Sequence, residues 1–124
     1  MPTAGLTIRE VADKTGITAH TLRYYERIGL MMPVSRAQSG HRRYGADDLR
    51  WVELLKRLHA SGMPIRRMLE FARLMRRGDV AGRRTLLDEH RLELETKVAE
   101  LLETLRTVRA KIGNYNRALA RRRA

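Results

Sequence analysis

The segment ITAHTLRYYERIGLMMP, residues 17–33, gathers side chains that could bind a polyanion. It carries two adjacent tyrosines together with His20, Arg23 and Arg27, and Thr18 stands where a helix would begin. Arginine can donate paired hydrogen bonds to guanine or to a phosphate, and histidine can donate to either group. If this helix entered a DNA groove, His20 and Arg23 near its start would lie closest to the base edges.

The adjacent tyrosines, Tyr24 and Tyr25, point about 100° apart on a helix, so they cannot both be buried in the same way. We expect one ring to pack inward and the other residue to present its hydroxyl to a phosphate. The alternative is that both are amphipathic residues at the edge of the core.

A second basic group lies in the sequence SGHRRY, residues 39–44, which follows helix-breaking residues such as Pro33. This pattern favours an exposed hairpin or wing that carries Arg42 and Arg43. A solvated basic loop is the simpler interpretation of this loop taken alone. Next to a basic helix, a wing that contacts phosphates or the minor groove becomes the better interpretation.

The composition points to the same partner. A chain of 124 residues fits one compact domain, or a small domain with an extended appendage. Its formal charge of +12 indicates a polyanionic partner, with nucleic acid the first to consider. Residues 1–78 carry fifteen basic and seven acidic side chains, against eleven and seven in residues 79–124. The N-terminal part is therefore the more basic one.

Other classes of function find little support in the residues. The absence of cysteine excludes disulfides, thiolate metal sites and thiol redox sensing by this chain. The four histidines are scattered and no glycine-rich phosphate loop is present, so we expect no enzymatic activity, no metal and no cofactor. Without an apolar run of roughly 18–20 residues or a signal peptide, we expect a cytoplasmic protein without membrane contact.

Two pairs of helices are expected to position these groups. Thr7 and Glu10 have the spacing of a capping box, which predicts a helix over residues 8–15. Thr18 can cap a second helix over residues 19–28. A third helix is expected over residues 46–60, and a fourth begins with Pro64 as its first residue.

The C-terminal part predicts one long helix with a narrow apolar seam. Apolar residues recur at alternating steps of three and four from Leu87 to Leu119, with Arg91 as the only polar occupant of that register. A second chain is the expected cover for this seam, and folding back on the chain's own domain is the alternative. The predicted dimerisation residues are Leu94, Val98, Leu101, Leu105, Val108, Ile112, Tyr115 and Leu119.

Together these segments resemble the MerR family of bacterial transcription regulators over essentially the whole chain. The sequence LTIREVADKTGITAHTLRYYERIGLMMP is similar to the family's helix-turn-helix signature, and SGHRRY is similar to its wing motif, Gly-x-Arg-x-Tyr. ADDLRWVELLKRLHASGMPI is similar to the following helix and second helix-turn-helix. The resemblance implies an all-α fold with a small β wing, in which residues 1–77 form a winged-helix DNA-binding domain. Residues 78–124 would form a linker and an antiparallel coiled-coil dimerisation helix.

The resemblance also implies a function and a set of DNA-binding residues. Members bind, as homodimers, a pseudo-palindromic spacer that lies between two promoter hexamers. They distort this spacer so that RNA polymerase can engage both hexamers. The residues that match family positions near DNA are Thr18, His20, Arg23, Tyr24, Tyr25, Arg42 and Tyr44. His59 falls where some members have a phosphate-contacting lysine, and Arg43 is added on charge. The full candidate set is Thr18, His20, Thr21, Arg23, Tyr24, Tyr25, Arg42, Arg43, Tyr44 and His59.

The effector and two rival functions stay open. The chain resembles an aldehyde-responsive branch with a reactive cysteine in the third helix, but Arg57 stands at that position. Alkylation of a cysteine therefore cannot be its switch, and a small-molecule effector is possible without being identified. The first rival function is an architectural or excisionase-like protein that bends DNA without instructing polymerase. The second is a coiled-coil interaction protein whose basic head docks on an acidic partner.

Overall fold

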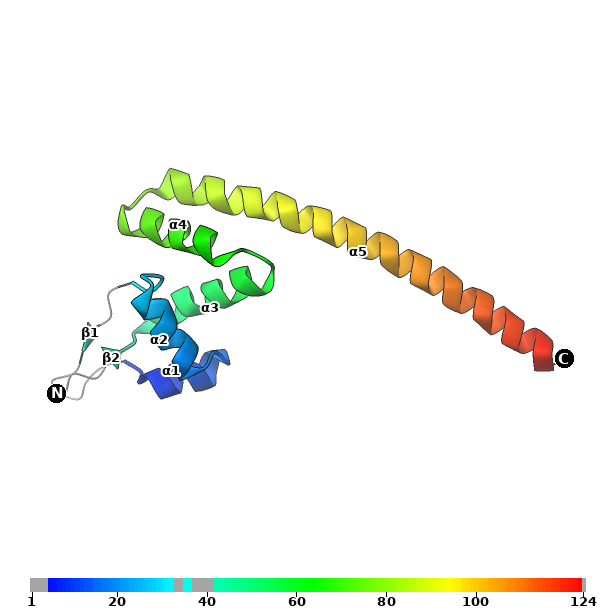
Figure 1. Ribbon diagram of the computed structural model, residues 1–124, viewed down its shortest axis with the longest axis horizontal. Helices are drawn as coiled ribbons and strands as arrows, with labels where there is room; N and C mark the ends of the chain where they lie inside the picture. Colours follow the sequence, from blue (N-terminus) through cyan, green and yellow to red (C-terminus); the bar gives the residue numbers. More distant parts are fainter. Residues whose placement is uncertain (1–4, 33–34, 37–41, 124) are drawn as a thin grey trace. The chain divides into compact units, whose positions relative to one another are not determined.

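The computed structural model describes residues 5–32, 35–36 and 42–123 (Figure 1). Its elements form two compact units, Met1–Leu86 and Leu87–Ala124. The prediction of a mainly helical chain that ends in a long helix is confirmed. In chain order the elements are α1 (Ile8–Thr15), α2 (Ala19–Arg27), β1 (Ser35–Arg36), β2 (Arg42–Arg43), α3 (Ala46–Ala60), α4 (Ile65–Arg76) and α5 (Val80–Arg123).

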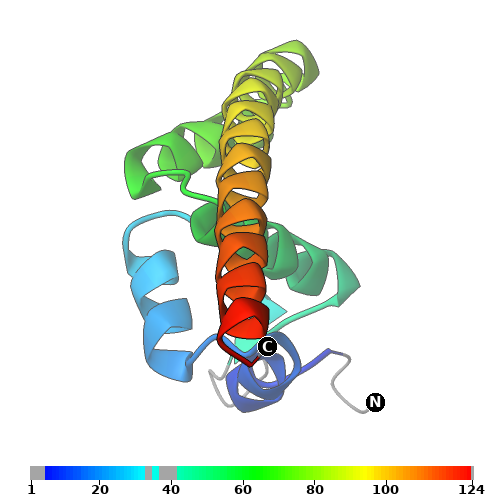
Figure 2. The same ribbon diagram turned by 90° about the vertical axis from the view of Figure 1, so that its right-hand side faces the viewer.

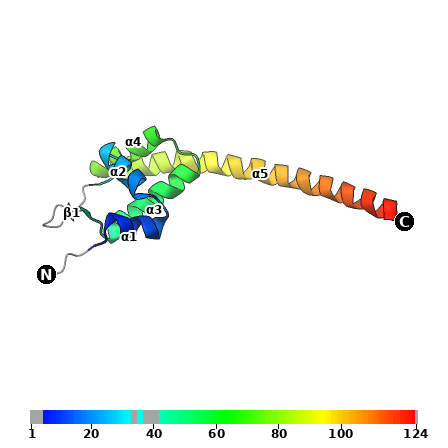
Figure 3. The same ribbon diagram turned by 60° about the horizontal axis from the view of Figure 1, so that its bottom comes forward.

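The first helix pair has the predicted caps. Thr7 Oγ1 accepts a hydrogen bond from the Glu10 amide, and the Thr7 amide donates to Glu10 Oε1, both at 3.1 Å. These two bonds satisfy amides that the first turn of α1 would otherwise leave unpaired. Thr18 caps α2, which ends at Arg27, one residue before the predicted end. α1 packs against both α2 and α3, and Figure 3 shows α1 beside α3.

The second helix pair begins at Gly45, whose amide donates to Asp48 Oδ2 at 2.8 Å. The predicted bounds of α3, residues 46–60, are confirmed. The prediction for α4 needs one correction, because Pro64 is its N-cap and Ile65 is its first residue. Pro64 has an extended backbone, with ψ at 154°, and so stands before the helix instead of within its first turn.

Trp51 on α3 links the two helix pairs. Its ring stacks on Phe71 of α4 with the ring centroids 5.4 Å apart. Its indole N–H donates to the carbonyl oxygen of Leu30 at 2.9 Å, which fixes the segment that follows α2. Arg76 of α4 adds two hydrogen bonds, of 2.8 and 2.6 Å, to the carbonyl oxygen of Gly29. α2 and α4 are visible in Figure 2 as the light blue and green helices of this unit.

Between the two helix pairs in the sequence, β1 and β2 form a short antiparallel ladder. Ser35 pairs with Arg43 and Arg36 pairs with Arg42. The segment before α1 extends this arrangement, because the Leu6 amide donates to the Tyr44 carbonyl at 2.7 Å and the Tyr44 amide donates to the Leu6 carbonyl at 2.8 Å. The predicted tip of the wing, residues 37–41, lies outside the described residues, so the wing as a whole stays a prediction.

α5 is a single helix of 44 residues, from Val80 to Arg123. The predicted domain boundary at residues 77–78 precedes this helix, whereas the compact units divide within it, between Leu86 and Leu87. The boundary between a DNA-binding and a dimerising part therefore stays a prediction. Across the described ranges, no helix combines the length and the apolarity that crossing a membrane requires.

Substitutions at two glycines can test the close contact between the segment before α1 and the backbone of Tyr44. Gly5 and Gly78 both have positive φ angles, 101° and 69°, where an alanine is strained by about 1–2 kcal/mol. A Cβ at Gly5 would lie 2.8 Å from the Tyr44 carbonyl oxygen, whereas a Cβ at Gly78 would meet nothing within 4 Å. Gly5→Ala should therefore lower the free energy of unfolding by about 1 kcal/mol more than Gly78→Ala does.

Urea denaturation at matched protein concentrations, followed by the fluorescence of the single tryptophan, measures this difference. Equal losses of stability in the two variants would show that the pairing of Leu6 with Tyr44 does not hold the segment before α1 in solution.

Candidate nucleic-acid interface

α2 separates its side chains into a buried face and an exposed face. Leu22 and Tyr25 are buried, with exposed fractions of 0% and 5%. His20, Arg23 and Arg27 are exposed, and they recur at the helical steps that bring side chains onto one face. The burial of Leu22 and Tyr25 in the core therefore turns a row of cationic and aromatic groups outward.

The two adjacent tyrosines differ as expected. Tyr25 packs inward while Tyr24 has an exposed fraction of 40%. Their ring centroids are 6.3 Å apart, and the Arg27 guanidinium lies 5.8 Å from the centroid of the Tyr24 ring. An arginine over a tyrosine face forms a cation–π contact. This contact orders the Tyr24 side chain on the outer face of α2.

The N-terminus of α2 is held by a pair of threonines. Thr18 Oγ1 accepts a hydrogen bond from the Thr21 amide at 3.1 Å, and the two hydroxyl oxygens are 3.0 Å apart. Thr18 is exposed and Thr21 is half-buried. The predicted DNA-binding threonines therefore have a clear local task, which is to fix where α2 begins. A helix N-terminus also favours anions, because its amides and its dipole are positive there.

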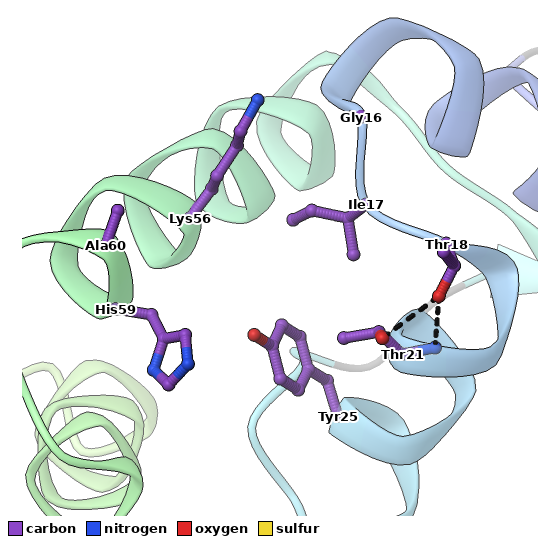
Figure 4. Close-up of a pocket in the computed structure, with 8 residues that line it drawn as sticks. All are labelled: Gly16, Ile17, Thr18, Thr21, Tyr25, Lys56, His59 and Ala60. Atoms are coloured by element: carbon purple, nitrogen blue, oxygen red, sulfur yellow. Dashed lines mark hydrogen bonds between the residues drawn. The ribbon is translucent and has the colours of Figure 1, made fainter.

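A pocket of about 310 Å³ opens between the turn that precedes α2 and the last turns of α3. Figure 4 shows the Tyr25 hydroxyl and the His59 ring turned into the space between the two helices. The pocket brings together four predicted residues, three from α2 and its N-cap and one, His59, from α3. It is lined by Gly16, Ile17, Thr18, Thr21, Tyr25, Lys56, His59 and Ala60.

The chemistry of this pocket suits an oxyanion. Burial, with a smaller contribution from neighbouring Tyr24, raises the pKa of Tyr25, so its hydroxyl keeps its proton at neutral pH and can donate a hydrogen bond. His59 is exposed on α3 and can donate through a ring N–H. Lys56, one turn earlier, donates to the Thr15 carbonyl oxygen and carries a positive charge at the same opening. Phosphate oxygens accept from all three kinds of donor.

The predicted wing residues have different outcomes. Arg43 is half-buried, and the side chain of Arg42 lies outside the described residues. The Tyr44 side chain has an exposed fraction of only 1% and belongs to the core, and its place near DNA stays a prediction.

Sequence reasoning left two cationic groups out of the candidate set. Arg27 belongs to the exposed face of α2, and the spacing of His20, Arg23, Tyr24 and Arg27 by steps of three and four could have identified it. Lys56 lines the pocket from another helix. No local pattern in the sequence marks Lys56, because its position depends on how α3 packs against α1.

The predicted dimerisation residues lie on α5. Leu94 is half-buried. Among the other seven, the exposed fraction ranges from 41% at Leu105 to 68% at Leu101. So long an apolar row costs free energy in water. An apolar row that is exposed in the single chain is what a dimerisation seam without its partner helix would show.

Comparisons with known proteins place this arrangement in one family. Residues 6–73 match the family described as MerR HTH family regulatory protein. The HTH-type transcriptional regulator AdhR of Bacillus subtilis is 41% identical over 91 residues, which cover 72% of this chain and 65% of that protein. An uncharacterised HTH-type transcriptional regulator of Haemophilus influenzae is 34% identical over 116 residues, 92% of this chain and 86% of that protein.

A solved structure extends the likeness to the fold. The crystal structure of HiNmlR, a MerR family regulator that lacks the sensor domain and is bound to promoter DNA, has a TM-score of 0.85. The two sequences are 33% identical, and the aligned part covers 94% of this chain and 94% of that one. Because the family match spans more than half of the sequence, the chain belongs to the MerR family of helix-turn-helix regulatory proteins.

Proposed function

We propose that the chain is a transcription regulator that binds a pseudo-palindromic promoter segment as a homodimer and distorts it to control RNA polymerase. The observation that carries this proposal is the division of α2 into a buried face and an exposed cationic face. The likeness to HiNmlR, a relative bound to promoter DNA, supports it. The proposed site of action is the cytoplasm, and the proposal includes no enzymatic step.

In this proposal α2 enters the major groove while the pocket beside it holds a backbone phosphate. His20 and Arg23, on the exposed face, reach base edges or phosphates. The hydroxyl of Tyr25 and the ring of His59 contact the phosphate in the pocket, with Lys56 adding charge. Arg42 and Arg43 contribute from the wing to the adjacent backbone or minor groove.

The second part of the proposal concerns the dimer. Two copies of α5 pack along their apolar seams and hold two heads at a fixed separation. A fixed separation allows the heads to occupy successive faces of the duplex, which matches a pseudo-palindrome. Because bending or untwisting the spacer costs free energy, the contacts of both heads are needed to hold the distorted form.

Footprinting on the DNA that flanks the coding region tests specific binding. If Arg23 reads a base, we expect Arg23→Ala to weaken binding to the protected segment by about 1–3 kcal/mol. If Arg23 contacts a phosphate, we expect the substitution to weaken binding to all DNA sequences alike and to lower the salt slope by about 1. Arg84→Ala, which removes the same charge from an exposed position on α5 outside the proposed dimer seam, is the matched control. In vitro transcription from the protected fragment then reports the effect on polymerase.

Equal affinity of the unaltered protein for the protected segment and for arbitrary DNA at physiological salt would contradict specific regulation.

The pocket makes a separate prediction. Tyr25→Phe keeps the ring but removes the hydroxyl, so affinity for DNA should fall by about 0.5–1.5 kcal/mol, the usual contribution of one hydrogen bond. His59→Lys places a fixed charge at the same opening and should make the salt slope steeper by about 0.9. Fluorescence anisotropy with a labelled duplex at several salt concentrations measures both effects.

Ala110→Lys adds the same charge on an exposed position of α5 and controls for the change in net charge. If His59→Lys and Ala110→Lys change the salt slope equally, the pocket does not hold a phosphate.

The dimer seam is tested by a charge placed inside it. Leu105→Lys should raise the dissociation constant of the dimer by at least tenfold, because an ammonium would lose its hydration at the packed seam. Ala110→Lys adds the charge on the opposite side of the helix and should leave association unchanged. Sedimentation equilibrium measures both variants, and a monomeric unaltered protein at micromolar concentration would contradict the proposed homodimer.

A further inference from the structure

Charge is segregated along α5. Residues 87–103 carry six acidic and two basic side chains, a formal charge of −4. Residues 104–123 carry seven basic side chains and no acidic one, a formal charge of +7. The whole of this segment lies within the single helix that ends at Arg123. We call residues 87–103 the acidic half and residues 104–123 the basic half.

The helix dipole does not account for this segregation. Acidic residues are favoured in the first turn of a helix and basic residues in the last, and the effect fades beyond one turn. The first turn of α5 contains no acidic residue, and the acidic half begins later, after Leu86. Arg121, Arg122 and Arg123 do lie in the last turn. The dipole therefore explains those three arginines but not the charges in the middle of the helix.

Ion pairs within the helix explain only part of the pattern. Arg91 bonds to Asp88 at 2.8 Å and to Glu95 at 2.7 Å, inside the acidic half. Arg106 bonds to Glu103 at 2.7 Å, across the boundary between the halves.

Beyond that boundary the basic half has no carboxylate of its own. Arg109, Lys111 and Arg117 have no acidic residue within four positions in the sequence, which is the reach of a pair along one helix face. The chain leaves these cations without an acidic partner on their own helix.

We propose that the segregated charges of α5 set the direction of the helix pair and restrict which helices can pair with it. This inference rests on the homodimer proposed above. In an antiparallel pair, the acidic half of each copy lies along the basic half of the other. In a parallel pair, the acidic half of one copy lies along the acidic half of the other, and the two basic halves also lie together, so both contacts are repulsive.

The apolar seam alone cannot make this choice. Its leucines, valines and isoleucine pack in either direction, because burial of apolar area is not directional. In coiled coils, charges on the positions that flank the seam influence the partner and the orientation. In this register Glu95 and Arg109 hold such positions, and most of the other charges of the two halves act at longer range. The family resemblance implies the antiparallel direction, and the charge pattern is the feature of this chain that enforces it. A related helix with uniform charge would be rejected.

Complementary charge reversal tests this inference. The first variant combines Glu93→Lys, Glu95→Lys, Glu100→Lys and Glu103→Lys, which makes the whole segment basic. The second combines Arg106→Glu, Arg109→Glu, Lys111→Glu and Arg117→Glu, which makes it acidic. We expect each variant alone to dissociate at least tenfold more readily than the unaltered protein at low salt. An equimolar mixture should form the heterodimer, which native mass spectrometry identifies by mass.

A third variant that carries all eight substitutions restores opposite halves with reversed polarity and should pair with itself again. This variant also controls for damage to the helix, because it contains every substitution of the other two. Raising the salt to about 1 M, where the Debye length is about 3 Å, should reduce the differences among all the variants.

The direction of the pair is measured separately. The chain has no cysteine, so Ala120→Cys introduces a single labelling site near one end of α5. A pyrene label there should give no excimer emission from an antiparallel dimer, because the two labels lie at opposite ends. Excimer emission would show a parallel pair and overturn the inference.

The inference also fails if the first two variants each form homodimers as tightly as the unaltered protein. In that case the proposed homodimer would stand, because its own test is the association of the unaltered chain.

Discussion

The burial of one face of α2 is the constraint on which the proposed interface depends. Leu22 is fully buried and Tyr25 nearly so, and burying a side chain of that size contributes about 1.5–3 kcal/mol. This contribution fixes the rotation of α2 about its axis, so the cations have one direction in which to point. Trp51 and Arg76 then hold the segment after the helix through the Leu30 and Gly29 carbonyl oxygens. The proposed DNA-facing surface is thus a consequence of the core.

Local sequence signals predicted most of the helices of this fold. The capping box of Thr7 and Glu10, and the Thr18 cap, act within a single turn, so their effect can be read from neighbouring residues. Pro64 shows the limit of such reasoning, because the start of α4 was predicted one residue too early. A proline suits both the N-cap and the first helical position, because neither needs its missing amide donor, and only the backbone angles distinguish them.

The candidate site was harder to predict because it joins distant elements. The exposed face of α2 follows from helical spacing alone, which is why His20 and Arg23 could be chosen from the sequence. The burial of Tyr44 could not be predicted from the sequence, because the pattern of a short strand does not show which side faces the core. The contribution of Lys56 to the pocket depends on the packing of α3, so no local signal could reveal it.

In the proposed dimer, the DNA-binding face of α2 and the apolar seam of α5 depend on each other. When two heads are joined, binding of the second becomes intramolecular, and its effective concentration depends on how rigid the connection is. α5 runs without a break from Val80 to Arg123. It is useful only if the two copies pair in one direction and register, because a reversed pair would place the heads at a different separation. In the proposed dimer, the direction in which the two copies of α5 pair would therefore set the affinity for DNA at α2, although the two helices carry separate chemistry.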